Sequence, residues 1–230
     1  MWATRSKCIP LSGLNRNHNI KGPGFGPGLF YQIHIFMKPF NPLFLLVLTL
    51  LLASGCAGRE EDSHTWKSAD IDFYLNSQAN LLTETVVRET FRNWGEHTHF
   101  DFHYRGRNRA GIRKDGKNTV SFLVRWPEDI PISKVGYCRT WYDRRGRIVE
   151  ADIIFNMQVA RFTTLRTNTP DSYYLEGVLT HEIGHMIGLD HIDDPSSCMK
   201  PKSSAEESYL RGEIDPLTLR AYRELYSMEY

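Results

Sequence analysis

Three histidines and a glutamate between positions 181 and 191 have the types and spacing suited to chemistry on a metal ion. If residues 180–187 are helical, His181 and His185 lie one turn apart on one face, so both imidazoles can reach a single ion. Gly188 tolerates a positive φ and lets the chain turn back, so that His191 approaches the same ion from another side. Three imidazoles with an open fourth position are the ligand set of a catalytic zinc site, whereas structural zinc is normally closed by four ligands.

Glu182 follows the first histidine directly, so we expect its carboxylate to lie beside the metal and not on it. From there it could take a proton from a metal-activated water and pass it to the leaving amine of a peptide bond. Two other interpretations stay open. The histidines could be ordinary surface or core residues of a helix, or the site could bind zinc without doing chemistry.

These residues resemble the zinc-binding signature of the metzincin metallopeptidases. Met199, eight residues after His191, is similar to the methionine of the metzincin Met-turn, which forms a hydrophobic floor beneath the three histidines. Leu189-Asp190-His191 and the short run to Met199 most resemble the matrixin family within this clan. Ile192 departs from the pattern, because matrixins commonly have a serine after the third histidine.

The resemblance implies an α+β domain over residues 70–230, with a twisted mixed sheet of about five strands, an antiparallel edge strand and three helices including the zinc helix. It also implies one catalytic Zn²⁺ and a protein or peptide substrate bound in an extended conformation along the edge strand. Structural calcium is compatible with it, although no residue pattern here identifies a calcium site. We expect a monomer.

Hydrophobic periodicity supports this order of elements. Alternating apolar residues predict strands at 71–75, 100–104, 120–124, 137–142 and 148–155, the last two joined as a hairpin. Helical spacing predicts helices at 82–94, with Thr83 as N-cap, at 172–187, and from Asp215 to Tyr226. Residues 105–117 are predicted to be a basic loop that faces solvent, and residues 203–212 a charged loop.

Other histidines and cysteines call for separate predictions. We expect His97, His99 and His103 to face solvent, and no second zinc site in residues 126–136, which contain neither histidine nor cysteine. Cys138 and Cys198 are predicted to form a disulfide that links the edge strand to the Met-turn, because an isolated pair is often joined in an oxidising compartment. The alternative is two unpaired thiols, which a Cα separation above about 7 Å would favour.

The N-terminal quarter of the chain has the pattern of an export signal. A basic residue, an apolar run and small residues before Cys56 predict a signal peptide over residues 37–55. Residues 52–56 resemble a bacterial lipobox, which implies that Cys56 carries a lipid, in the outer membrane if the cell has one. Residues 1–36 are then an extension from an upstream start, and residues 56–69 a tether. The alternatives are a plain signal peptide with a nearby cut, or a buried apolar helix.

Length and charge limit the function classes. A chain of 230 residues with 41% hydrophobic residues suits one domain. Without residues 1–55, which hold five of the 28 basic residues, 23 basic residues face 27 acidic ones, and the net charge of −4 argues against a nucleic-acid partner. We therefore predict a lipid-anchored zinc endopeptidase outside the cytoplasm. The alternatives are a non-catalytic peptide-binding lipoprotein and a zinc hydrolase of a non-peptide, cell-wall amide.

Overall fold

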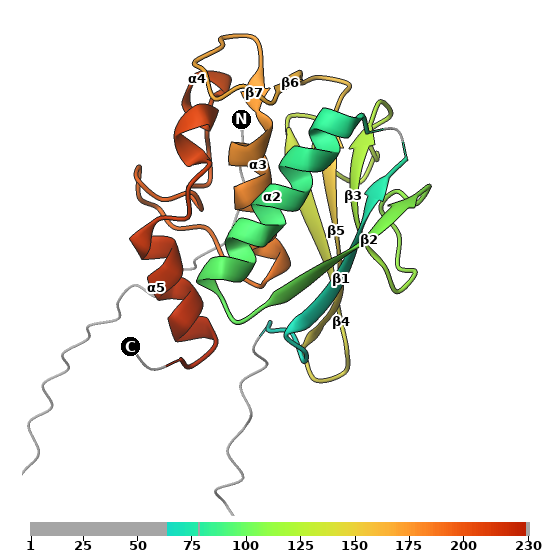
Figure 1. Ribbon diagram of the computed structural model, residues 1–230, viewed down its shortest axis with the longest axis vertical. Coiled ribbons are helices and arrows are strands. Elements are labelled where there is room, and N and C mark those ends of the chain that lie inside the picture. Colours follow the sequence, from blue (N-terminus) through green and yellow to red (C-terminus); the bar gives the residue numbers. More distant parts are fainter. Residues whose placement is uncertain (1–63, 78, 229–230) are drawn as a thin grey trace, which may run out of the picture. The chain divides into compact units, whose positions relative to one another are not determined.

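A five-stranded mixed sheet forms the centre of the computed structural model, which describes residues 64–77 and 79–228 (Figure 1). The strand order is β2-β1-β3-β5-β4, and all neighbours are parallel except the antiparallel hairpin of β4 and β5. The predicted antiparallel edge strand is therefore confirmed as β4. The strands are β1 (Asp70–Asn76), β2 (Asp101–Asn108), β3 (Asn118–Leu123), β4 (Gly136–Tyr142) and β5 (Ile148–Asn156).

Two long helices share one layer against this sheet, as Figure 1 shows. They are α2 (Leu81–His97) and α3 (Leu175–Met186), and the chain ends in α5 (Pro216–Leu225). The predicted stripe of α2 is buried, with Val87, Phe91 and Trp94 each at most 1% exposed. Trp94 donates its indole N–H to the carbonyl of Thr180 at 3.2 Å, which ties α2 to α3 one residue before His181. The core thus fixes the start of the histidine segment.

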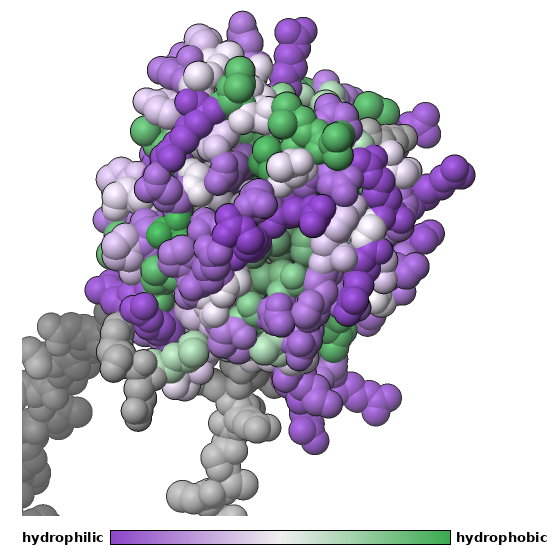
Figure 2. Space-filling view, in the orientation of Figure 1, coloured by the Kyte–Doolittle hydropathy of each residue, from purple (hydrophilic) through white to green (hydrophobic). Residues whose placement is uncertain are grey.

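The outer face of α2 faces solvent. Figure 2 shows this side of the molecule as mostly hydrophilic, with small groups of hydrophobic residues. Leu81 and Leu82, at the start of the helix, are 76% and 59% exposed. No helix in the described part of the chain has the length and apolar character needed to cross a membrane.

Several element boundaries differ from the sequence-based predictions. Asn80, not Thr83, caps α2, because its side-chain oxygen accepts the backbone N–H of Thr83. The metal-site helix begins three residues later than predicted, since β7 (Tyr173–Tyr174) pairs with β6 (Phe162–Thr163).

The segment predicted as a charged loop at 203–212 contains the short helix α4 (Ala205–Ser208) and a 3₁₀ turn, η1 (Tyr209–Arg211). Ser204 and Glu207 form a capping box at its start, a local pattern that the prediction overlooked. The described residues therefore hold four α-helices, against the three predicted.

The basic loop after β2 is not simply solvent-facing. Two buried carboxylates of β5, Glu150 and Asp152, accept the backbone N–H groups of Asp115, Gly116, Arg113 and Thr119 at 2.7–2.9 Å. Burial raises the pKa of Asp152 to about 7. The three hydrogen bonds from Arg113, Asp115 and Gly116 hold the loop against β5, and the fourth joins Asp152 to β3.

Residues 64–69, expected to be part of a tether, pack on the domain. Trp66 donates its indole N–H to the carbonyl of Met186 at 2.7 Å, and its backbone N–H to the hydroxyl of Tyr226 at 3.3 Å. It also forms a parallel bridge with Ile148. The segment around Trp66 is therefore part of the folded domain and not of a free tether. The predicted extension, signal peptide and Cys56 lie outside the described residues.

Candidate metal centre and cleft

The side chains of His181, His185 and His191 converge on one point. The Nε2 atom of His185 lies 3.0 Å from that of His181 and 3.1 Å from that of His191. The Nδ1 atom of His181 lies 2.7 Å from the carbonyl oxygen of Cys198. The Nδ1 atom of His185 lies 2.8 Å from the carbonyl oxygen of Leu189. Since a carbonyl can only accept, both Nδ1 atoms carry the proton and both Nε2 lone pairs face the centre.

Lone pairs that face one another this closely repel unless a cation lies between them. Burial lowers the pKa of all three imidazoles, well below the ordinary value for His181 and to about 4 for His185. The rings are therefore neutral near pH 7, which is the form that binds a metal. The donor set, three imidazole nitrogens with one side open, suits zinc.

A sharp turn brings the third histidine to the first two. Gly188 has φ +90°, and a side chain there would place its Cβ 2.1 Å from the carbonyl oxygen of His64. The backbone N–H of Leu189 bonds to the carbonyl of Gly184 at 2.9 Å and closes the helix. The positive φ expected at Gly188 is confirmed, and His191 reaches the site as predicted.

Met199 lies directly beneath this helix. It is 0% exposed, and a Cβ on Gly184 would come within 2.3 Å of its sulfur. The carbonyl of Met199 accepts the backbone N–H of Ile192 at 3.0 Å, so the turn is tied to the segment that carries His191. Met199 is therefore buried against the helix that carries His181 and His185, and Gly184 makes room for it.

Glu182 projects from α3 between the histidines and the edge strand. It is 2% exposed, and its Oε1 would lie 2.6 Å from a Cβ on Gly136, so a larger residue at the start of β4 would displace the carboxylate. Burial raises the pKa of Glu182 to about 8, while the charge of Lys134 and a hydrogen bond from the backbone of Cys138 oppose the shift. The carboxylate lies where sequence reasoning placed it, beside the histidines.

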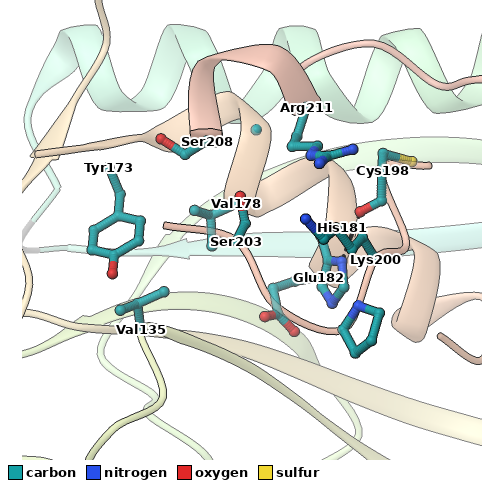
Figure 3. A pocket seen from close by; sticks show the side chains of 12 residues that line it. Val135, Tyr173, Val178, His181, Glu182, Cys198, Lys200, Ser203, Ser208 and Arg211 are labelled. Atoms are coloured by element: carbon teal, nitrogen blue, oxygen red, sulfur yellow. Dashed lines mark hydrogen bonds between the residues drawn. The ribbon is translucent and has the colours of Figure 1, made fainter. Parts of the chain in front are cut away.

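Two cavities meet at Glu182. The first, of about 440 Å³ with part of it open to solvent, lies between α3 and the segment after Met199 (Figure 3). Its walls include Val135, Tyr173 and Val178. The second, of about 710 Å³ and also open, runs along β4 past His185 and His191. Together they form a cleft that follows the edge strand across the histidines.

The predicted disulfide between Cys138 and Cys198 is wrong, because both thiols are free. The sulfur of Cys198 points away from His181 (Figure 3) and lies 3.3 Å from the hydroxyl of Thr218 in α5. The carbonyl of Cys198, not its thiol, faces the metal centre. Burial raises the pKa of both thiols, to about 12 for Cys198, so neither offers a thiolate near neutral pH.

His99 and His103 make side-chain contacts that the predicted solvent exposure did not include. His97 and His99 are exposed, but His99 contacts the hydroxyl of Tyr222 through Nδ1. His103 is half-buried and lies 3.3 Å from Asp70 and 3.7 Å from Asp101. Those two aspartates are exposed, and their pairing with His103 accounts for the cluster without a metal.

Sequence reasoning missed two residues of the cleft. Lys134 precedes β4 and lines the larger cavity, and His64 lines the same cavity from the N-terminal segment. Neither belongs to a recognisable motif. Only their position next to the predicted edge strand and the predicted start of the domain could have drawn attention to them.

Comparison with protein-family models places the histidine segment within a known family. The matrixin family model matches residues 65–227, which include the histidines, Glu182 and Met199. A search of curated proteins finds no significant match. The α+β fold with its antiparallel edge strand agrees with the family assignment.

Proposed function

The chain belongs to the matrixin family, whose members are zinc metalloendopeptidases, and on this premise we propose that it hydrolyses internal peptide bonds with Glu182 as the general base. The observation that carries the proposal is the convergence of the three histidines beside a buried carboxylate, with the Nε2 atom of His185 lying 3.0 Å from that of His181 and 3.1 Å from that of His191. That arrangement provides ligands, an open position and a base in one cleft.

His181, His185 and His191 would hold the zinc ion through Nε2, while the carbonyls of Cys198 and Leu189 fix the orientation of the first two rings. Zinc supplies a Lewis acid that lowers the pKa of water and polarises the substrate carbonyl. Glu182 accepts the proton as the water oxygen forms a bond to the carbonyl carbon. It then donates that proton to the amine nitrogen as the carbon–nitrogen bond breaks.

The edge strand supports an extended substrate. One side of β4 pairs with β5, and its other side borders the cleft, where a peptide can add as a further strand. The smaller cavity, with Val135, Val178 and Tyr173 in its walls, would receive one apolar side chain of the substrate next to the scissile bond.

The site of action is a second part of the proposal. The lipobox-like residues 52–56 and the apolar run before them support export and lipid attachment at Cys56. The peptidase domain would then work outside the cytoplasm, at the surface of a membrane.

The experiment compares purified full-length protein with its Glu182→Ala variant. We expect both to bind one zinc ion per chain, and only the wild type to cleave an unfolded protein, with chelator abolishing cleavage and added zinc restoring it. Equal cleavage by both would refute the role of Glu182. If the wild type binds zinc and cleaves nothing, a non-catalytic peptide-binding protein is favoured. If it hydrolyses amide bonds in cell-wall fragments but not in proteins, a hydrolase of a non-peptide amide is favoured.

A further inference from the structure

A cation lies in the cleft beside the proposed base. Lys134 is half-buried just before β4 and lines the larger cavity together with Tyr137, Glu182, His185 and His191. Its Nζ atom lies 5.4 Å from the centre of the Tyr137 ring, a cation–π contact between two residues that line the same cavity. The cation therefore shares one solvent-accessible space with the general base and two of the histidines.

The backbone of Lys134 is fixed by the sheet. Asn156, which is 0% exposed at the end of β5, donates its side-chain amide to the carbonyls of Lys134 and Ile132 at 2.9 and 3.0 Å. The backbone N–H of Asn156 bonds to the carbonyl of Val135 at 2.8 Å. The buried side-chain amide of Asn156 thus fixes the backbone of residues 132–135 against the end of β5. The Cα atom of Lys134 is held there.

The charge of Lys134 acts on the whole centre. It opposes the rise in the pKa of Glu182, and it contributes to the lowered pKa of each of the three histidines. Burial lowers the pKa of Lys134, and the charge of Glu182 opposes that shift and favours the ammonium form. Because Glu182 is only 2% exposed, the charge of Lys134 acts on it more strongly than it would on a group at an exposed surface.

We propose that Lys134 is a catalytic residue of the peptidase described above, and that its ammonium group binds the oxygen of the scissile carbonyl as negative charge develops there. The inference rests on the proposed function. As the water oxygen bonds to the carbonyl carbon, the π electron pair moves onto the carbonyl oxygen, which accepts a hydrogen bond from Nζ. When the pair returns and the carbon–nitrogen bond breaks, Glu182 protonates the amine and Lys134 keeps its proton.

A different role for the same cation predicts a different result. If Lys134 instead bound an acidic side chain or the terminal carboxylate of a substrate, its loss would weaken binding of acidic peptides only. Stabilisation of the developing oxyanion affects every peptide and lowers kcat, because the interaction strengthens only in the transition state.

Arg139 offers a matched control. Its guanidinium lies 5.8 Å from the same Tyr137 ring, but it pairs with Asp129 and lines neither cavity. Removing it takes away a positive charge next to the same aromatic ring without touching the cleft.

The first experiment compares Lys134→Met, Lys134→Arg and Arg139→Met with wild type in the full-length, zinc-loaded protein on a peptide without acidic residues. We expect Lys134→Met to lose about 10²-fold in kcat with a small change in KM, Lys134→Arg to recover part of the loss, and Arg139→Met to match wild type. Zinc content and melting temperature should be unchanged in all three. A kcat equal to wild type in Lys134→Met, or a loss confined to acidic peptides, overturns the proposal.

The second experiment measures binding by calorimetry and does not depend on turnover. A phosphinic peptide, which mimics the anionic tetrahedral species, should lose affinity in Lys134→Met, while a ketomethylene peptide of the same sequence should not. Equal effects on both ligands contradict the proposed role. Absence of cleavage by the wild type refutes the peptidase assignment together with this inference, whereas normal cleavage by Lys134→Met refutes the inference alone.

Discussion

Each of the first two ligand histidines is oriented by a main-chain carbonyl and not by a carboxylate. His181 uses the carbonyl of Cys198 and His185 that of Leu189, so the turns after the helix decide which ring nitrogen faces the metal. The sequence predicted that the ligands are histidines and that His181 and His185 lie on one face of a helix. It could not predict these carbonyls, because main-chain groups carry no residue-specific signal.

The pKa of His185 gives a prediction at this scale. In the folded, metal-free protein it is lowered to about 4 from the ordinary 6.5, so between these values the unfolded chain binds a proton that the folded chain does not. Stability contributed by His185 is therefore lost as the pH falls from 6.5 to 4. The raised pKa of Glu182, about 8, acts in the opposite direction below pH 8.

Comparison with a variant separates the two effects. The melting temperature of the metal-free wild type should fall more steeply between pH 7 and pH 5 than that of His185→Gln, because the variant keeps Glu182 and lacks the titrating ring. Parallel melting curves across this pH range would show that His185 titrates normally in the folded protein.

The free cysteines show where residue-level prediction failed. A disulfide was predicted because Cys138 and Cys198 form an isolated pair, one in the predicted edge strand and one next to Met199. The direction of the Cys198 side chain, toward Thr218 in α5, depends on how the last helix packs. No pattern in the sequence specifies that packing.

At the scale of elements, Asp215 connects the last helix to the Met-turn. One carboxylate oxygen accepts the backbone N–H groups of Leu217 and Thr218 and so caps α5. The other accepts the backbone N–H of Cys198 at 2.7 Å, next to Met199. The carboxylate is thus shared between a helix terminus and the floor of the metal centre.

Asp215→Ala should lower the free energy of unfolding by about 1–3 kcal/mol, since it removes an N-cap and leaves a Met-turn N–H without its partner. We also expect weaker zinc binding, because Cys198 orients His181. Ser204→Ala is the control, since Ser204 caps α4 and does not contact the Met-turn. Denaturant unfolding and zinc titration measure both effects, and equal zinc affinity in the two variants would contradict the link.

Long periodic elements were predictable and short ones were not. The strands, the hairpin, α2 and the capped α5 follow from alternation, helical spacing and the Asp215-Pro216 start. The two-residue strands β6 and β7 and the four-residue helix α4 are too short to show a period. They are defined by contacts with α3 and its neighbours, which only the folded chain supplies.

At the scale of the whole molecule, the segment around His64 and Trp66 packs against the C-terminal end of the helix that carries His181 and His185. Trp66 bonds to the carbonyl of Met186 at the end of α3, and the carbonyl of His64 packs against Gly188. The ring of His64 contacts that of Tyr142 at 4.7 Å, at the far end of the edge strand. The chain that would lead to the anchor therefore joins the domain beside one end of the cleft.

Lipid attachment is tested on the full-length chain. In a bacterial host that processes lipoproteins, we expect the wild type to partition into the membrane fraction and Cys56→Ser to be released from it, with equal peptidase activity per zinc ion. Membrane retention of the variant would mean that something other than Cys56 holds the protein.

The central claim is that three imidazole nitrogens share one zinc ion and leave a position open. X-ray absorption spectroscopy of the zinc-loaded, full-length protein measures this directly. We expect three nitrogen ligands at about 2.0–2.1 Å, one further light-atom ligand and no sulfur, with loss of a nitrogen in His191→Ala. A zinc–sulfur distance of about 2.3 Å, or a spectrum unchanged in His191→Ala, would contradict the metal centre described for this chain.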